Sequence, residues 1–179
     1  MGRRGFASIV SRILYLLPWH AVSPEHGFAA SYLSRCGVVV DIGCGGGGLY
    51  EILRRAGWDG EYICVELYIP PRIAHTIHSD ASRPPLRDRC CGCCVFLDSL
   101  FYISRDPVSL LRAWASICEE ILVIDLNPSM PYIHNKLVDL IEGIGRRDPE
   151  KLSLEAIGKG LRAKILRRGS WYAVKIMPP

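Results

Sequence analysis

A glycine-rich stretch begins three residues after the β-branched run Val38–Val40. Residues 43–48 contain five glycines, and the spacing Gly43-x-Gly45-x-x-Gly48 fits a phosphate-binding turn. Glycines let the backbone turn sharply and approach a ligand closely, and they leave the N-terminus of a following helix aimed at it. The sequence therefore predicts a ligand-binding loop at the end of a strand.

Asp41, two residues before the first glycine, discriminates between two ligands of such loops. A nicotinamide dinucleotide would place its anionic pyrophosphate unfavourably close to this carboxylate. S-adenosylmethionine has no phosphate and carries a cationic sulfonium and an α-ammonium. The pattern Asp41-x-Gly43-x-Gly45-x-Gly47 therefore favours S-adenosylmethionine, because the dinucleotide pattern alone is a weak signal.

Two further acids follow later apolar runs. Glu66 lies 23 residues after Gly43, close to the ~20 typical of the acid that binds ribose hydroxyls. Both cofactors contain that ribose, so Glu66 supports the fold without selecting the ligand. Asp80 follows the next run and can accept a hydrogen bond from an adenine amino group. Ligands of open α/β sheets bind at the carboxyl ends of strands, where we expect these acids to meet.

Short apolar runs alternate with helical patterns from Val38 onward, which predicts a doubly wound α/β fold with a mostly parallel, Rossmann-like sheet. The expected strands are residues 38–42, 61–67, 74–80, 93–97 and 121–126. Helices are expected over 49–56, closed by Gly57, and from Asp106-Pro107 to about Cys118. The connection between the second and third runs is much shorter than the ~10–12 residues of a usual crossover. Either its helix is reduced to a turn, or the third strand is misplaced.

The C-terminal part predicts a helix over 132–144, a linker rich in charge and glycine, and an antiparallel hairpin around Gly169-Ser170. We expect one domain over residues 1–179. Within it, residues 1–36 would form a helical cap, 37–127 the cofactor-binding core, and 128–179 the helix and hairpin.

The N-terminal segment predicts an amphipathic helix that Pro18 ends. Its apolar residues recur at helical spacing, at Phe6, Ile9, Val10, Ile13, Leu14 and Leu17. We expect this helix to cover the ligand site; the alternative is a helix on a membrane surface, because basic residues flank it. Arg12 interrupts the apolar stretch and no clear cleavage site follows, so we expect a cytoplasmic protein without a membrane partner.

Composition excludes some function classes. The chain has 179 residues, 49% of them hydrophobic and 22% charged, which is typical of a globular domain. The net charge of +4 is below that of a dedicated nucleic-acid-binding protein. The scarcity of Asn and Gln is a weak indication of a thermophilic source.

The eight cysteines include the cluster Cys90–Cys94. Four cysteines in one strand alternate between its two faces and cannot converge on one tetrahedral ion, so we expect no metal site. We expect the cluster to fill the strand core as small hydrophobic residues. Disulfides stay an alternative, because intracellular proteins of hyperthermophiles can be rich in them.

Residues Val38–Asn127 resemble the class I S-adenosylmethionine-dependent methyltransferases, particularly the type 11 subgroup. The resemblance rests on the glycine loop, on "CVEL", on "SDASRPPL" and on "CCVFLDSLFYI". It implies a sheet of about seven strands with the last antiparallel. It also implies S-adenosylmethionine contacts at Asp41, Gly43, Cys44, Gly45, Gly47, Glu66, Leu67, Asp80, Ala81, Leu97 and Asp98. The chain departs from the family in its short second crossover and in "ICEEIL", which lacks the usual glycine turn before the fifth strand.

The expected reaction is methyl transfer by in-line displacement, in which positioning carries most of the catalysis. A general base is needed only if the acceptor loses a proton, and the candidates are His20, His26, Asp98, Tyr102 and His134. Of these, Asp98 is the first choice as a residue that lines the site, without an assigned catalytic role.

The expected acceptor is a small molecule. The stretch Asn127–Tyr132 is similar to a signature of amino-methylating nucleic-acid methyltransferases, but it follows the fifth expected strand and not the fourth. RNA is therefore the less favoured acceptor. The alternatives are an NAD(P)-dependent oxidoreductase and a methyltransferase-like binding subunit that requires a partner protein.

Overall fold

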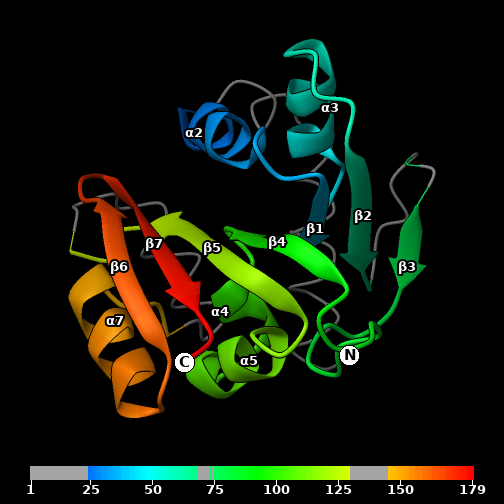
Figure 1. The fold of residues 1–179 in the computed structure, drawn as a ribbon. Helices are drawn as coiled ribbons and strands as arrows, with labels where there is room; N and C mark the ends of the chain where they lie inside the picture. The colour runs from blue at the N-terminus through cyan, green and yellow to red at the C-terminus, as the bar shows by residue number, and fades with distance from the viewer. Residues whose placement is uncertain (1–23, 68–72, 74, 130–144) are drawn as a thin grey trace, which may run out of the picture.

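A seven-stranded sheet forms the centre of the molecule in a computed structural model, which describes residues 24–67, 73, 75–129 and 145–179. The strand order is β3-β2-β1-β4-β5-β7-β6 (Figure 1). The strands are β1 (Val38–Ile42), β2 (Glu61–Glu66), β3 (Thr76–His78), β4 (Cys91–Leu97), β5 (Cys118–Leu126), β6 (Arg162–Arg167) and β7 (Trp171–Met177).

Strand directions confirm the predicted fold class. Strands β1 to β5 pair in parallel, whereas β7 pairs antiparallel with both β5 and β6. The third expected strand is correctly placed despite its short connection, because Cys64 of β2 pairs with Thr76 of β3. The expected C-terminal hairpin is also present and supplies the antiparallel edge.

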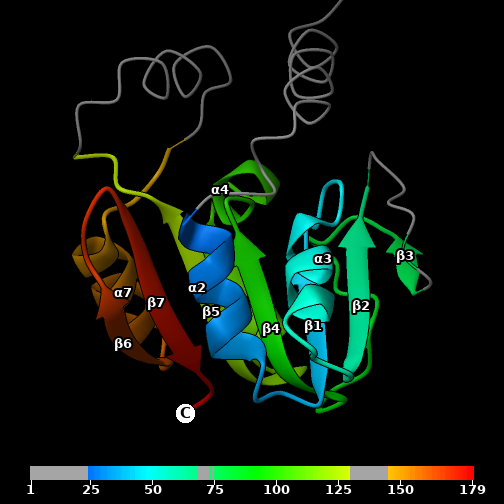
Figure 2. The same cartoon turned by 90° about the horizontal axis from the view of Figure 1, so that it is seen from above.

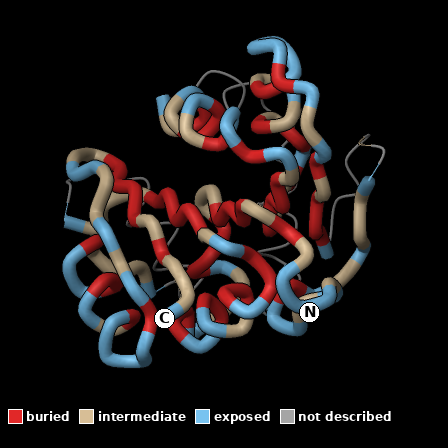
Figure 3. The backbone as a smooth tube through the Cα atoms, viewed as in Figure 1, coloured by how far each residue is buried: buried red, intermediate tan, exposed pale blue. Residues whose placement is uncertain are grey.

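Helices cover both faces of the sheet. On one face lie α2 (Pro24–Leu33) and α3 (Gly48–Arg55). On the other lie α4 (Leu100–Ile103), α5 (Pro107–Trp114) and α7 (Pro149–Gly158) (Figures 1 and 2). Each face has its own core, with Leu33, Leu53 and Tyr62 buried on the first and Phe96, Trp114 and Tyr172 on the second. The central strands are accordingly buried, whereas the outer sides of the helices are exposed (Figure 3).

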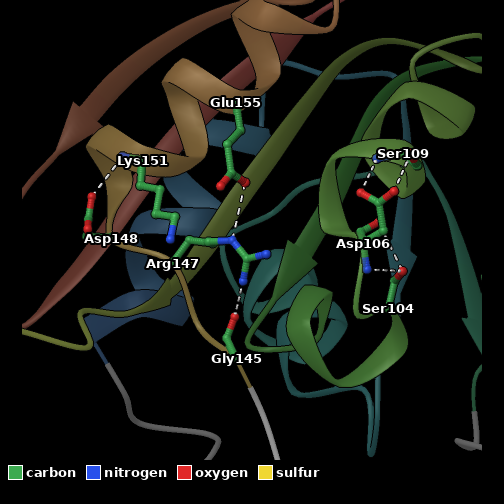
Figure 4. Close-up of polar contacts among 8 residues, drawn as sticks. All are labelled: Ser104, Asp106, Ser109, Gly145, Arg147, Asp148, Lys151 and Glu155. Carbon is green, nitrogen blue, oxygen red and sulfur yellow. Dashed lines mark hydrogen bonds and ion pairs between the residues drawn. The ribbon is translucent and has the colours of Figure 1, made fainter.

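Side chains fix the beginnings of two helices on the second face. The Ser109 amide donates to Asp106 Oδ1 at 3.1 Å, which confirms the predicted cap of α5 (Figure 4). The Lys151 amide donates in the same way to Asp148 Oδ1 at 2.8 Å at the start of α7. Helix α5 ends at Trp114 and not near Cys118, because Cys118 already begins β5.

Among the described helices, α2, α4 and α7 were not predicted. The prediction of a linker after residue 144 is wrong for Pro149–Gly158, which form α7. The N-cap Asp148 and the first-turn Pro149 are ordinary signals of a helix start, and Leu152 and Ala156 are buried on one side of it. Helix α2 was missed because its apolar residues do not gather on one side of a helical wheel. The expected helices over 6–17 and 132–144, together with His20 and His134, lie outside the described residues. None of the helices in the described ranges combines the length and the apolar character that a membrane-spanning helix needs.

Six cysteines form the disulfides Cys36–Cys93, Cys44–Cys64 and Cys94–Cys118. The expectation that the 90–94 cluster only fills the core is therefore wrong for Cys93 and Cys94, although both are buried. Neighbouring segments of the fold bring their Cα atoms within 6.1 and 5.9 Å of their partners, a separation that a disulfide can bridge. Cys90 and Cys91 have free thiols.

Candidate functional site

The loop between β1 and α3 requires glycine for two reasons, its backbone conformation and the close approach of a neighbouring side chain. Gly43, Gly45 and Gly47 have φ angles of +74°, +52° and +83°, a region that other residues rarely adopt. A Cβ atom on Gly43 would lie 2.8 Å from Ser99 Cβ. Gly47 precedes the first residue of α3. The loop therefore turns directly into the N-terminus of a helix, as predicted.

Three backbone amides connect this loop, β2 and the Glu66 carboxylate. The Gly43 amide donates to the Val65 carbonyl oxygen at 2.8 Å, and the Gly45 amide donates to Glu66 Oε2 at 3.0 Å. The Leu67 amide donates to Glu66 Oε1 at 2.9 Å. The structure thus brings together two predicted site elements, the loop and Glu66, and holds this buried carboxylate directly against the loop.

Asp41 lies beneath the loop, with its side chain toward the face that α2 and α3 cover. It is only 2% exposed, and the Tyr62 hydroxyl donates a hydrogen bond to its Oδ2. Burial raises the pKa of Asp41 to about 7; the nearby Glu66 charge also raises it, and the Tyr62 hydrogen bond lowers it. Its Oδ1 is buried without a hydrogen-bond partner among the described residues. Asp41 therefore retains one acceptor for a donor that the described protein does not supply.

The ends of β2 and β3 lie side by side. The Ser79 amide donates to the Glu66 carbonyl oxygen at 3.2 Å, and a ring nitrogen of His78 lies 2.6 Å from the Leu67 carbonyl oxygen. Asp80 follows on the surface, where the Ser82 amide donates to its Oδ1 at 2.9 Å and lowers its pKa. Ala81 is buried in the core. Asp80 is thus adjacent to the Glu66 strand end, as predicted.

Asp98 follows Leu97 at the end of β4 in a left-handed backbone conformation, with φ +52°. Its amide donates to the Ile124 carbonyl oxygen of β5 at 2.9 Å. Burial and then the Asp125 charge raise the pKa of Asp98 well above its usual range, whereas Arg146 opposes this shift. Asp98 Oδ1 is a second buried acceptor without a partner in the described part of the chain.

A buried ion pair beside Asp98 was not predicted. Arg146 Nε donates to Asp125 Oδ1 at 2.7 Å, and the Arg146 guanidinium also donates to the Tyr102 hydroxyl at 3.1 Å. Tyr172 pairs with Asp125 across β5 and β7, and burial followed by the Asp125 charge raises its pKa. The sequence could have indicated Asp125 as a site residue, because it lies near the end of the fifth apolar run. No local pattern indicates Arg146, because it reaches the site from outside the expected core.

The predicted residues therefore form two neighbouring groups at the carboxyl edge of the parallel strands, where α4 lies (Figure 2). The glycine loop, Glu66 and the Asp80 segment occupy the ends of β1, β2 and β3. Asp98 and Tyr102 lie with Asp125 and Arg146 at the ends of β4 and β5.

The structure also places two other candidates. Asn127 is used structurally, because its amide donates to the Ser170 carbonyl oxygen and its Nδ2 donates to that of Gly169. It thereby holds the turn between β6 and β7. His26 is buried in α2.

Among the residues that the structure describes, one group of side chains outside the loop could bind a metal ion by residue type. Cys36, Cys93 and Glu120 place donor atoms within 4.8 Å of one another. The two sulfurs are joined in a disulfide, and the Glu120 carboxylate pairs with Arg35 and Lys175. The group consequently offers no thiolate to a metal ion.

Known protein structures share this architecture. No protein-family model and no curated protein sequence matches the chain. The mitomycin 7-O-methyltransferase MmcR superimposes with a TM-score of 0.65 at 21% identity, over 87% of this chain and 53% of that one. A SAM-dependent methyltransferase from Aquifex aeolicus superimposes with a TM-score of 0.67 at 14% identity, over 94% of this chain and 98% of that one.

A third similar structure was determined with ligands bound. It is the O-methyltransferase NcsB1 from neocarzinostatin biosynthesis, in complex with S-adenosyl-L-homocysteine and 1,4-dihydroxy-2-naphthoic acid. It gives a TM-score of 0.65 at 18% identity, over 86% of this chain and 57% of that one. The chain thus spans about half the length of MmcR and NcsB1 and nearly all of the Aquifex protein. These likenesses show that the chain has the Rossmann-like fold of methyltransferases.

Proposed function

We propose that this chain is an S-adenosylmethionine-dependent methyltransferase that acts on a small-molecule acceptor. The hydrogen bond from the Gly45 amide to Glu66 Oε2 carries the proposal. It joins the two elements expected to bind the opposite ends of one nucleoside cofactor, on a fold shared with methyltransferases.

The chemistry of the site fits S-adenosylmethionine better than a dinucleotide. Two buried carboxylate oxygens, Asp41 Oδ1 and Asp98 Oδ1, lack hydrogen-bond partners among the described residues. Cationic or donor groups satisfy such acceptors, whereas a pyrophosphate would add negative charge beside them. The same argument disfavours an NAD(P)-dependent oxidoreductase.

Residue roles follow from their positions at the strand ends. Glu66 and Leu67 would hold the ribose, and Asp80 and Ala81 the adenine. Asp41, Gly43, Cys44, Gly45 and Gly47 would surround the methionine end, with Leu97 and Asp98 on its far side. The bound cofactor supplies a methyl group activated by its sulfonium, and the chain's residues align the acceptor with it.

The acceptor would lie over the ends of β4 and β5. Asp98, Tyr102 and the Asp125–Arg146 pair meet there, and burial, followed by the Asp125 charge, raises the pKa of Asp98 well above its usual range. A similar fold binds a naphthoic acid in NcsB1, which supports a small-molecule acceptor for this chain.

Incubation with S-adenosylmethionine labelled in its methyl group tests this proposal. We expect release of S-adenosylhomocysteine together with label in a low-molecular-weight acceptor from a panel of phenols, carboxylic acids and amines. Label that enters RNA and no small molecule would contradict the proposed acceptor class. Turnover only after another protein is added would favour the partner-dependent alternative.

A further inference from the structure

Cys44, the residue between Gly43 and Gly45, is joined to Cys64 of β2 by a disulfide. We infer that this bond is a thiol–disulfide exchange site that controls the glycine loop, so that oxidised protein binds the cofactor more tightly than reduced protein. The effect on affinity rests on the proposed function, whereas the effect on the loop does not.

Three consecutive loop residues are attached to three consecutive residues of β2. The Gly43 amide donates to the Val65 carbonyl oxygen, Cys44 is bonded to Cys64, and the Gly45 amide donates to Glu66. The disulfide is the one covalent bond of these three links. It also encloses α3, since 20 residues separate the two cysteines in sequence.

Cofactor binding makes the covalent link more important. If Glu66 accepts hydrogen bonds from the ribose, its carboxylate must share or give up the Gly45 amide. The disulfide then still holds the loop against β2. Because a loop that is ordered before binding loses less conformational freedom, the oxidised protein has the lower cost of binding.

The two sulfurs differ in access, which defines the exchange reaction. Cys44 is half-buried and Cys64 is completely buried. The thiolate of a dithiol reductant therefore attacks the Cys44 sulfur; the disulfide breaks, and Cys64 leaves as a thiolate that takes up a proton. The second thiol of the reductant then attacks the mixed disulfide and releases Cys44 as a thiol. The protein gains two electrons and two protons, and the dithiol becomes a disulfide.

Two other disulfides provide matched controls. Cys94–Cys118 connects β4 and β5 and contains no glycine-loop residue, and Cys36–Cys93 connects the segment after α2 to β4. Like Cys64, Cys118 is a buried strand residue. The variants Cys64→Ala and Cys118→Ala therefore each remove one disulfide sulfur from the core, but only the first releases the loop.

The test measures S-adenosylhomocysteine affinity by calorimetry, and hydrogen exchange of residues 43–47 without ligand, before and after treatment with dithiothreitol. We expect reduction to weaken binding about two- to tenfold in wild type and in Cys118→Ala, on the scale of ordering one or two groups. Cys64→Ala should bind as weakly as reduced wild type and should not respond to dithiothreitol. Exchange of the loop should accelerate in the same samples.

Equal affinity and equal loop exchange in oxidised and reduced wild type would overturn the inference, as would alkylation of both Cys44 and Cys64 in protein isolated without reductant. The comparison of oxidised with reduced wild type tests the inference even if Cys64→Ala does not fold. If neither redox state binds S-adenosylhomocysteine, the proposed function fails. Loop exchange then still decides whether the disulfide holds the loop.

Discussion

Arg146 Nε lies 2.7 Å from Asp125 Oδ1, and the two side chains are 5% and 0% exposed. This ion pair joins the segment before α7 to the end of β5, beside the expected acceptor position. The replacement Arg146→Met would leave the Asp125 carboxylate buried without this cation. We expect a loss of about 3–5 kcal/mol in the free energy of unfolding, measured with urea.

The exposed pair of Glu51 and Arg55 on α3 is the control for this experiment. Solvent screens this pair, so Arg55→Met should change the free energy of unfolding by no more than about 1 kcal/mol. An equally small effect of Arg146→Met would contradict the structural importance of the buried pair.

Asp41 predicts a specific pH dependence of stability. Its pKa is about 7 in the folded protein, above the ordinary value of 3.8, so the folded state binds this proton more tightly than the unfolded state. The contribution of Asp41 to the free energy of unfolding is therefore fully present below about pH 4. This contribution is lost as the pH rises through 7, by at most roughly 1.4 kcal/mol per pH unit. We expect Asp41→Asn to remove this decline from urea unfolding curves recorded between pH 5 and pH 8. An unchanged pH dependence in Asp41→Asn would show that Asp41 is already ionised at pH 5.

Gly43 and Gly46 should respond differently to a methyl group. Gly43→Ala adds a Cβ 2.8 Å from Ser99 Cβ at a φ of +74°, whereas a Cβ on Gly46 meets no atom within 4 Å. Left-handed backbone strain alone costs about 1–3 kcal/mol. Thermal or urea unfolding should therefore show clear destabilisation by Gly43→Ala and little change by Gly46→Ala. Equal effects of the two replacements would contradict the described loop conformation.

The sequence predicted the parallel core because β1, β2, β4 and β5 are continuous apolar runs, and such runs indicate strands covered on both faces. It located Glu66 and the glycine loop because their spacing is local. Local patterns could not indicate the Arg146–Asp125 pair, since 21 residues and the end of a strand separate its members.

The disulfides show the same limit. Cys44 and Cys64 meet only because β1 and β2 are adjacent and parallel, in a register that pairs Asp41 with Cys64. A count of cysteines left their pairing open. Helix α2 was missed for a different reason, because its apolar residues do not gather on one side of the helix. Its burial comes from packing against the other core residues of the same sheet face.

The choice of cofactor tests the central claim most directly, by parallel calorimetric titration with S-adenosylmethionine, S-adenosylhomocysteine and NAD. We expect the first two to bind and NAD not to bind. Glu66→Ala should weaken S-adenosylhomocysteine binding by about 1–3 kcal/mol, the range for a hydrogen-bonded charged group lost from a buried site. Glu61→Ala, at the exposed beginning of the same strand, should leave binding unchanged. Binding of NAD without binding of S-adenosylmethionine would contradict the account.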